Sequence, residues 1–276
     1  MTDRYAVIGN PIAHSRSPAI HARFAEQTGQ RLRYEALLAP LDAFEQTVRE
    51  FAASGGRGLN VTVPFKERAF AMADRCSPRA QAAGAANTLV FDAAGVFADN
   101  TDGVGLVRDL AVRHALPLAG TPILLLGAGG AARGVIEPLL AAGVAELRIV
   151  NRTAARAEAL AQRFADPRVS GAGFETLAAA SRVGAILVNA TSAGLADEAP
   201  PVPVAIFAAA RFAYDMVYGA QPTAFLRAAA AAGCPAMADG LGMLVEQAAE
   251  SFRLWRGVLP DTDPVYRALR EAIGAA

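Results

Sequence analysis

Lysine, cysteine and histidine are scarce in this sequence of 276 residues, which contains only two cysteines and three histidines. Cys76 and Cys234 lie far apart in the chain, so they provide neither a disulfide framework nor the close spacing of a thiolate metal site. The histidines have no metal-ligand spacing with a cysteine or an acidic cluster. We therefore expect no metal ion, and we expect the reducing environment of the cytoplasm.

A net charge and a long apolar run are also missing. The 26 basic and 26 acidic side chains cancel, whereas nucleic-acid-binding proteins usually carry a basic excess. The longest uncharged stretch, between Arg113 and Arg133, is interrupted by prolines and glycines, which makes it a poor membrane span. The N-terminus has no signal-peptide layout. These features predict no nucleic-acid partner and no membrane association.

The basic residues consist of 25 arginines and one lysine, Lys66. A coding bias explains the arginines. Under such a bias, a residue type that has nearly vanished can survive where its chemistry cannot be replaced. Lys66 is therefore a candidate functional residue, although a lone lysine is more often a solvated surface side chain.

Short apolar runs alternate with helical segments along most of the chain. Strands are predicted at residues 5–8, 34–38, 58–63, 88–91, 96–98, 123–126, 147–150, 185–188 and 212–216. Helices are predicted between most of these strands and at the C-terminal end, from 240 to 255 and from 263 onward. Residues 92–95, between the strands 88–91 and 96–98, predict a hairpin instead. This alternation is typical of α/β architecture with mostly parallel sheets. We predict two α/β domains, of which the second is doubly wound.

A glycine-rich turn directly follows the apolar run 123–126 and opens a helix. Its sequence, Gly127-Ala128-Gly129-Gly130-Ala131-Ala132, fits the dinucleotide-binding pattern G-x-G-x-x-[G/A] in the required context. Gly127 permits the tight turn, Gly129 lets a pyrophosphate approach the backbone, and Ala132 lets the helix pack close to the strand. The helix N-terminus favours the phosphates. The pattern predicts a Rossmann-type nucleotide site, although an ordinary glycine-rich turn would look similar.

The end of the next strand indicates which dinucleotide binds. NAD sites usually place an acidic residue there for the ribose 2′-hydroxyl. This chain has Asn151-Arg152-Thr153, with Arg156 one helical turn beyond Arg152. An arginine can clamp a 2′-phosphate, which a carboxylate would repel. A solvated arginine pair is the alternative, but cations at a helix N-terminus oppose its dipole. We therefore predict NADP(H).

Short polar motifs lie at predicted strand ends and helix starts in both halves of the chain. They cover residues 10–18, 60–67, 84–88, 100–103, 189–194 and 239–247. Together, and in this order, they closely resemble the shikimate dehydrogenase family, and the likeness runs from Ile8 to about Trp255. The resemblance implies reversible, NADPH-dependent reduction of 3-dehydroshikimate to shikimate.

The resemblance also implies a domain plan and a set of site residues. Residues 1–101 plus 239–276 would form the substrate domain, to which the C-terminal helices return, and residues 102–238 the NADP domain. The catalytic pair would be Lys66 and Asp102. The substrate-binding residues would be Ser15, Ser17, Thr62, Lys66, Asn87, Asp102, Tyr218 and Gln247, with the two serines and the tyrosine at the carboxylate. The cofactor-binding residues would be Gly127, Ala128, Gly129, Gly130, Ala131, Asn151, Arg152, Thr153, Arg156, Thr191, Ser192, Met216, Val217, Gly240 and Met243.

The chemistry of these residue types agrees with such a reaction. Hydride addition to a ketone places negative charge on its oxygen, which a nearby cation stabilises and a proton must then neutralise. Lysine can do both, whereas arginine keeps its proton. A carboxylate such as Asp102 would hold the ammonium of Lys66 in place and favour its charged form.

Structural roles remain open for several of these residues. Ser17 and Asp102 could be helix N-caps, Gln247 could be exposed helix surface, and Tyr218 and Met243 could be packing residues. Other functions also remain open: a quinate/shikimate dehydrogenase with relaxed cofactor use, a methylene-tetrahydrofolate dehydrogenase, or a non-catalytic NADP- or metabolite-binding relative. Monomer and homodimer are equally compatible with the sequence.

Overall fold

The computed structural model describes residues 2–179, 183–191, 193 and 198–274. The chain divides into two compact units. The first consists of Met1–Gly105 and Leu244–Ala268, and the second of Leu106–Met243 and Leu269–Ala276. Within the described residues no helix is long and apolar enough to cross a membrane.

The first unit contains a six-stranded sheet in the order β2-β1-β3-β5-β6-β4. Strand β1 pairs in parallel with β2 and β3, whereas β5 pairs antiparallel with β3 and β6, and β4 joins β6 in parallel. The mixed pairing reflects the predicted hairpin between β5 and β6, which reverses the chain. The strands are β1 Asp3–Gly9, β2 Leu32–Leu38, β3 Gly56–Val61, β4 Arg75–Cys76, β5 Thr88–Asp92 and β6 Gly95–Asp99.

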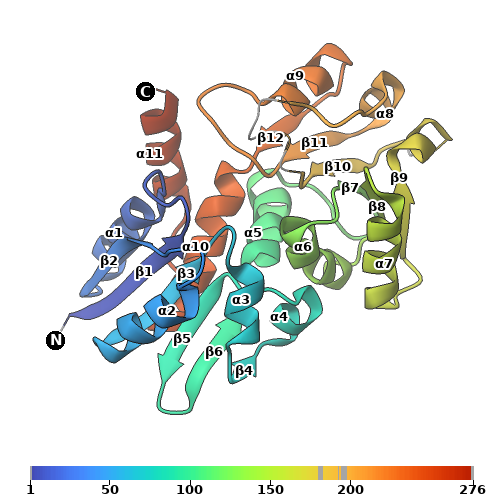
Figure 1. The fold of residues 1–276 in the computed structure, drawn as a ribbon. Coiled ribbons are helices and arrows are strands. Elements are labelled where there is room, and N and C mark those ends of the chain that lie inside the picture. The colour runs from blue at the N-terminus through green and yellow to red at the C-terminus, as the bar shows by residue number, and fades with distance from the viewer. Residues whose placement is uncertain (1, 180–182, 192, 194–197, 275–276) are drawn as a thin grey trace. The chain divides into compact units, whose positions relative to one another are not determined.

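Helices cover both faces of this sheet (Figure 1). Alternate residues of β1 and β3, such as Ile8 and Leu59, pack with Phe44 of helix α2 in one buried cluster. On the other face Tyr5 of β1 stacks on Trp255 of α10, with ring centroids 4.7 Å apart. The helices that lie wholly or partly in this unit are α1 Ser17–Thr28, α2 Phe44–Ala53, α3 Lys66–Ala71, α4 Pro78–Ala83, α5 Asp102–Arg108, α10 Leu241–Arg256 and α11 Asp263–Gly274.

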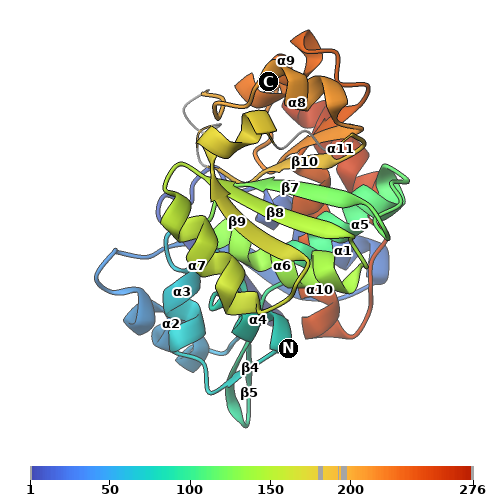
Figure 2. The same ribbon diagram turned by 90° about the vertical axis from the view of Figure 1, so that its right-hand side faces the viewer.

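The second unit contains six parallel strands in the order β12-β11-β10-β7-β8-β9 (Figure 2). Numbered from its first strand, this is the 6-5-4-1-2-3 order of a dinucleotide-binding Rossmann sheet. The strands are β7 Pro122–Leu126, β8 Glu146–Asn151, β9 Val169–Gly173, β10 Ile186–Asn189, β11 Phe212–Asp215 and β12 Met237–Asp239. The helices are α6 Gly130–Ala141, α7 Ala154–Phe164, α8 Val204–Ala209 and α9 Ala224–Ala231, with a π-helical turn at Asp109–Arg113 and a 3₁₀ helix at Phe174–Ala179.

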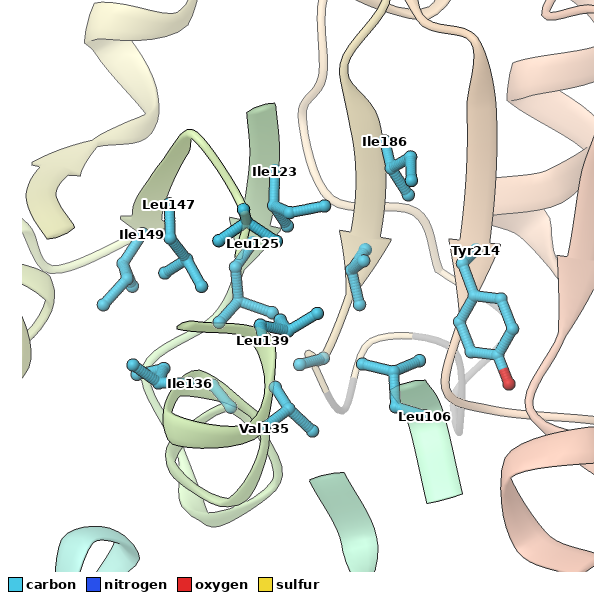
Figure 3. Close-up of a cluster of buried hydrophobic side chains, with 14 of the residues drawn as sticks. Leu106, Ile123, Leu125, Val135, Ile136, Leu139, Leu147, Ile149, Ile186 and Tyr214 are labelled. Atoms are coloured by element: carbon cyan, nitrogen blue, oxygen red, sulfur yellow. The ribbon is translucent and has the colours of Figure 1, made fainter. Parts of the chain in front are cut away.

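Two buried clusters show that this sheet is covered on both faces. Ile123 and Leu125 of β7 pack with Val135 and Leu139 of α6 on one face (Figure 3). Leu124 of β7 packs on the other face, in the cluster that holds side chains of α8 and α9. Because both faces are buried, the central strands β7 and β10 are almost wholly apolar. The predicted fold class, two α/β units of which one is Rossmann-type, is confirmed.

Three strands escaped the sequence prediction: β4, β9 and β12. All three are short and lie at sheet edges. Strand β9 has the sequence VSGAG, and Gly171 within it lies so close to α7 that an added Cβ would sit 2.3 Å from the carbonyl carbon of Ala157. Close helix packing rather than strand propensity therefore selects its residues.

Candidate active site

Lys66 is the first residue of α3, close after the end of β3. The start of α3 is anchored by Phe65, which is buried and stacks on Phe44 with ring centroids 4.6 Å apart. The Phe65 amide donates to the Thr62 carbonyl at 3.0 Å, and the Ala86 amide donates to the Lys66 carbonyl at 2.9 Å. These contacts hold the backbone of Lys66 in place, so its flexible side chain is attached to a fixed backbone.

Asp102 is the first residue of α5 and meets Lys66 directly. Its Oδ2 atom lies 2.5 Å from the Lys66 Nζ atom. The side chain of Asp102 is 8% exposed and that of Lys66 is 22% exposed, so the pair is shielded on one side and open on the other. The structure thus brings together the two residues that the sequence predicted as a catalytic pair.

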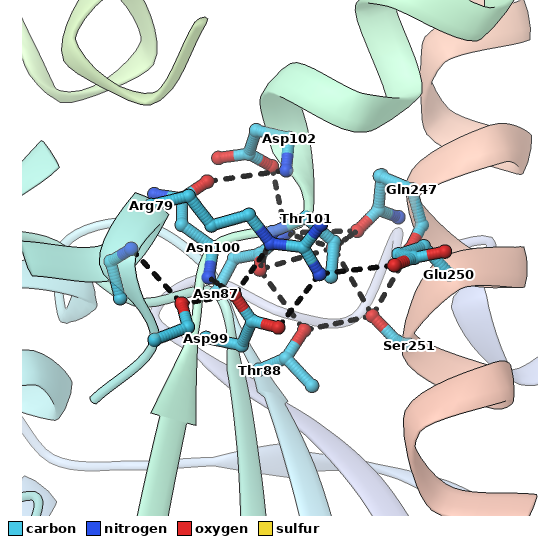
Figure 4. A network of polar contacts seen from close by, with 12 residues as sticks. Arg79, Asn87, Thr88, Asp99, Asn100, Thr101, Asp102, Gln247, Glu250 and Ser251 are labelled. Carbon is cyan, nitrogen blue, oxygen red and sulfur yellow. Dashed lines mark hydrogen bonds and ion pairs between the residues drawn. The ribbon is translucent and has the colours of Figure 1, made fainter. Parts of the chain in front are cut away.

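Asn87 connects Asp102 of this pair to Gln247 (Figure 4). The Asn87 side chain is 2% exposed, and its Nδ2 atom donates to Asp102 Oδ1 at 2.8 Å, Thr101 Oγ1 at 2.9 Å and Gln247 Oε1 at 3.1 Å. Its Oδ1 atom accepts from the Thr101 amide at 2.8 Å. Gln247 is buried, so the alternative prediction that it lies on the exposed surface of a helix is wrong. Lys66, Asp102, Asn87 and Gln247 therefore form one polar cluster.

A layer of hydroxyl and amide groups beneath this cluster was missed by the sequence reasoning. Ser251 is fully buried on α10 and accepts from Asn60 Nδ2 at 2.9 Å. Its hydroxyl also lies 2.8 Å from Thr88 Oγ1 and 3.2 Å from Thr101 Oγ1. The available signal was its helical spacing from Gln247, which places both residues on one face of α10.

Ser15, Ser17 and Thr62 follow the ends of the neighbouring parallel strands β1 and β3. Ser15 Oγ accepts from the Ser17 amide at 3.3 Å. The N-cap position of α1 belongs to Arg16, so the capping interpretation of Ser17 is wrong. A Cβ on Gly9 would sit 2.5 Å from Thr62 Cγ2, which explains why glycine ends β1.

A buried histidine of α1 and a half-buried tyrosine of β2 stack on each other in this unit. His21 stacks on Tyr34 with ring centroids 4.1 Å apart. Burial lowers the pKa of His21 to about 3, so this side chain is neutral at physiological pH. Burial raises the pKa of Tyr34, whose hydroxyl donates to Asn60 Oδ1 at 2.7 Å. Neither residue adds a charge near Asn60.

The glycine-rich turn of the second unit has the geometry that a dinucleotide requires. Gly127 adopts φ +107°, a conformation that favours glycine, and its amide donates to the Val150 carbonyl at 2.7 Å. Nothing lies within 4 Å of a Cβ added to Gly129 or Gly130, so their backbone is open to a ligand. Ala132 is fully buried. Ala128 and Ala131 lie between these residues in the same turn.

The end of β8 presents cations and no carboxylate. Arg152, Thr153 and Arg156 are exposed, and neither arginine side chain hydrogen-bonds or ion-pairs with another described residue. Asn151 Nδ2 donates to the Thr153 carbonyl at 3.0 Å. Thr153 occupies the N-cap position of α7, but its side chain makes no capping hydrogen bond. The site is thus available to an anionic group such as a 2′-phosphate.

The other predicted cofactor residues follow the ends of β10, β11 and β12. The buried Asn189 donates to the buried Asp215, and this pair holds the chain at the ends of β10 and β11. Burial raises the pKa of Asp215. Asn189 Oδ1 accepts from Thr191 Oγ1 at 2.7 Å, and the Asn189 carbonyl accepts from the Met216 amide at 2.9 Å. Asp215 Oδ1 accepts from the Val217 amide at 3.1 Å.

Three further predicted residues belong to this second unit. A Cβ on Gly240 would sit 2.1 Å from the Met216 carbonyl oxygen, so a larger residue cannot fit there. Met243 is 9% exposed and belongs to the buried cluster on the α6 face, which favours a packing role. Tyr218 is half-buried after β11. Ser192 lies outside the described residues.

Metal-binding clusters are absent from the described part of the chain: no group of three histidine, cysteine or acidic side chains could hold an ion there. Cys76 and Cys234 are both free.

A Rossmann unit with an open glycine-rich turn, joined in one chain to an α/β unit with a lysine–carboxylate pair, defines a dinucleotide-dependent oxidoreductase. Family models agree: residues 7–89 match the shikimate dehydrogenase substrate binding domain, residues 109–196 match shikimate/quinate 5-dehydrogenase, and residues 240–270 match the shikimate 5′-dehydrogenase C-terminal domain. The chain belongs to the shikimate dehydrogenase family and is an NADP-dependent enzyme of that family.

Individual relatives cover nearly the whole chain. The shikimate dehydrogenase (NADP(+)) of Aromatoleum aromaticum is 59% identical over 98% of both chains. The crystal structure of an Ael1 enzyme from Pseudomonas putida is 49% identical, with a TM-score of 0.93 over 97% of this chain and 98% of that one. Shikimate 5-dehydrogenase from Thermus thermophilus, solved with NADP(H) and shikimate, is 41% identical, with a TM-score of 0.85 over 98% of this chain and 100% of that one.

Proposed function

We propose that this chain catalyses the reversible, NADPH-dependent reduction of 3-dehydroshikimate to shikimate, with Lys66 and Asp102 as the catalytic pair. The observation that carries the proposal is the 2.5 Å contact between Lys66 Nζ and Asp102 Oδ2, within a buried cluster of amides, in a chain of this family. A lysine that is partly open to solvent and held by a carboxylate can both stabilise an oxyanion and deliver a proton.

The substrate would be held by the first unit. Thr62, Lys66, Asn87, Asp102 and Gln247 would hydrogen-bond the ring hydroxyls, because amide and hydroxyl groups both donate and accept. The carboxylate would lie at Ser15 and Ser17. In this scheme residues 1–101 plus 239–276 serve as the substrate domain, and residues 102–238 serve as the NADP domain.

The residues of the second unit fit NADP(H). Its adenosine 2′-phosphate would bind Arg152 and Arg156, which are exposed and carry no carboxylate partner among the described residues. The pyrophosphate would lie on the turn Gly127–Ala131, whose backbone is open at Gly129. The remaining binding residues would be Asn151, Thr153, Thr191, Ser192, Met216, Val217, Gly240 and Met243.

When held at the glycine-rich turn and by Arg152 and Arg156, NADPH would supply the hydride that the carbonyl carbon of the substrate accepts. The charge that develops on the carbonyl oxygen is stabilised by the Lys66 ammonium, which then donates a proton from Nζ to form the hydroxyl. Asp102 keeps the ammonium aimed at that oxygen, and Asn87 fixes the Asp102 carboxylate through its other oxygen at 2.8 Å. In the reverse direction Lys66 in its neutral form accepts the hydroxyl proton.

In this scheme the chain would bind small molecules, and neither a nucleic acid nor a membrane. It would act in the cytoplasm, as a monomer or a homodimer. Among related activities, serine at both positions 15 and 17 resembles the shikimate-specific members of the family more than the quinate/shikimate enzymes, where a threonine often replaces one of them. Arg152 favours NADP over NAD for the same reason that it favours a 2′-phosphate.

The proposed function is tested by following NADPH formation with shikimate and NADP⁺. The same enzyme is then assayed with quinate in place of shikimate and with NAD⁺ in place of NADP⁺. We expect the highest kcat/KM for the shikimate and NADP⁺ pair. Equal efficiency with quinate would indicate the dual-substrate enzyme instead, and tight shikimate binding without turnover would indicate a non-catalytic relative.

A further inference from the structure

Arg79 lies outside the residues that would touch the substrate, yet it joins two segments that carry them. It is the second residue of α4, and its side chain is 20% exposed. Its Nε and Nη2 atoms donate to the two carboxylate oxygens of Asp99, both at 2.7 Å. Nη2 also donates to Glu250 Oε1 at 3.0 Å. Figure 4 shows the guanidinium between the two carboxylates.

Asp99 controls the segment that ends in Asp102. It is the last residue of β6 and is 2% exposed. Its Oδ1 atom accepts from the Asn100 amide at 2.7 Å, and its carbonyl accepts from the Asn87 amide at 3.0 Å. The Asn100 side chain in turn accepts from the Asp102 amide at 3.2 Å. A displaced Asp99 would therefore shift Asp102 and Asn87 together.

Glu250 controls the face of α10 that reaches the polar cluster. It is 2% exposed and lies one helical turn after Gln247 and directly before Ser251. Gln247 accepts from Asn87, and Ser251 accepts from Asn60. The Arg79 guanidinium therefore ties the β6 end, which leads to Asp102, to the helix that carries Gln247.

The charges show why Arg79 is difficult to replace. Asp99 and Glu250 are nearly inaccessible carboxylates, and a buried charge that loses its partner is strongly destabilised. Arg253 also donates to Glu250, at 2.7 Å, but its side chain is 45% exposed and it makes no hydrogen bond to Asp99. Lysine could supply the charge of Arg79, but it lacks the planar fork that holds both oxygens of Asp99.

We propose that Arg79 is a positioning residue, which sets the placement of Asp102 and Gln247 by holding Asp99 and Glu250 together. The inference rests on the proposed function, because it is expressed through turnover of shikimate. A misplacement of about 1 Å can lower a rate about 100-fold. The effect should fall on shikimate and not on the cofactor, since the contacts of Arg79 lie in the first unit.

The test compares Arg79→Lys and Glu250→Gln with the control Arg75→Gln, in the full chain. Among the carboxylates of the described residues, the Arg75 guanidinium pairs only with the exposed Asp92, so the control touches neither Asp99 nor Glu250. We expect kcat/KM for shikimate to fall about 10- to 100-fold in Arg79→Lys, and to fall less in Glu250→Gln, which keeps the Asp99 fork. The KM for NADP⁺ should stay unchanged in both variants, and Arg75→Gln should match the wild type. Because Glu250→Gln removes a buried charge, it remains informative if Arg79→Lys folds poorly.

A purely structural role would give a different pattern. It would lower Tm and the yield of folded enzyme, but folded Arg79→Lys and Glu250→Gln would keep wild-type kcat and KM for shikimate. That result would overturn the inference while the wild type still turns over shikimate. An inactive wild type would instead overturn the proposed function itself.

Discussion

Lys66 and Asp102 each occupy the first residue of a helix, but the two helix ends affect them differently. The positive end of a helix dipole favours the Asp102 carboxylate and disfavours the Lys66 ammonium. The 2.5 Å contact with Asp102 offsets this cost for Lys66. The lysine is thus held at a place where an isolated cation would be poorly stabilised, and it remains 22% exposed toward a ligand.

Replacement of the lysine tests this role at a single residue. We expect Lys66→Ala to lower kcat by several orders of magnitude with a modest change in the KM for shikimate, as loss of a transition-state interaction should. Lys66→Arg should fail to restore the rate, because arginine keeps its proton.

The control for this experiment is Arg68→Ala, on the same helix. Arg68 pairs with Glu45 and donates to the Leu41 carbonyl, away from Asp102. Steady-state kinetics should show near-wild-type constants for Arg68→Ala. A kcat close to that of the wild type in Lys66→Ala would refute the catalytic assignment.

The cofactor preference is also decided by single residues. Arg152→Asp places a carboxylate where a 2′-phosphate would bind, and loss of a charge-assisted hydrogen bond costs roughly 1.5–3 kcal/mol. We expect the KM for NADP⁺ to rise about 10- to 100-fold, and the preference for NADP⁺ over NAD⁺ to shrink. Arg211→Asp makes the same charge change just before β11, at the N-terminal ends of the parallel strands, whereas Arg152 follows the C-terminal end of β8. This control should leave the KM for NADP⁺ and the preference for NADP⁺ over NAD⁺ unchanged. Equal losses in the two variants would contradict a specific phosphate contact.

At the scale of elements, the start of α10 is fitted closely to the π-helical turn Asp109–Arg113. A Cβ on Gly242 would sit 1.9 Å from Asp109 Oδ1. Asp109 is fully buried, accepts from Tyr214 at 2.7 Å and from Arg113 at 3.0 Å, and has its pKa raised by burial. Because its carboxylate is held on several sides, it cannot swing away from a new methyl group.

Gly242→Ala should therefore destabilise the protein by about 1–3 kcal/mol, as overpacking of a filled interior typically does. Gly274→Ala is the control, since nothing lies within 4 Å of an added Cβ at the end of α11. Denaturant unfolding should show a lower midpoint for Gly242→Ala, while Gly274→Ala stays level with the wild type. Similar midpoints for the two variants would show that the Asp109 turn yields more easily than its contacts indicate.

At the scale of the whole molecule, the chain carries a single lysine side chain among its 276 residues. An amine-selective reagent can therefore modify only one side chain of this type. In most enzymes many surface lysines obscure such an experiment. Here the composition of the entire chain makes the modification site-specific.

We expect acylation of Lys66, which removes its charge and its transferable proton, to abolish shikimate turnover in proportion to its extent, and shikimate to slow the modification. Peptide mass mapping separates the Lys66 adduct from reaction at the terminal amine. Full activity after complete modification of Lys66, or a modification rate that shikimate leaves unchanged, would argue against a place for Lys66 in the substrate site.

The sequence predicted the regions where a local pattern carries the information. Apolar runs predicted the central strands β7, β8, β10 and β11, because strands buried on both faces have few polar side chains. Gly127 predicted the glycine-rich turn because its φ of +107° favours glycine, and Gly129 predicted it because a residue without a side chain leaves the backbone open. The edge strands β4, β9 and β12 were missed because their sequences have no such pattern and depend on packing by neighbours.

By itself, the sequence determined the α/β class, the dinucleotide turn, the arginines at the end of β8 and the single lysine. Each follows from a residue type or a short spacing. Only the tertiary structure decided that Asn87 joins Asp102 to Gln247, 160 residues from Asn87, and that Ser251 bonds Asn60 across 191 residues. It also decided that Arg79 spans Asp99 and Glu250. Hydrogen bonds between such distant segments exist only once the sheet and its helices have packed, so no local pattern encodes them.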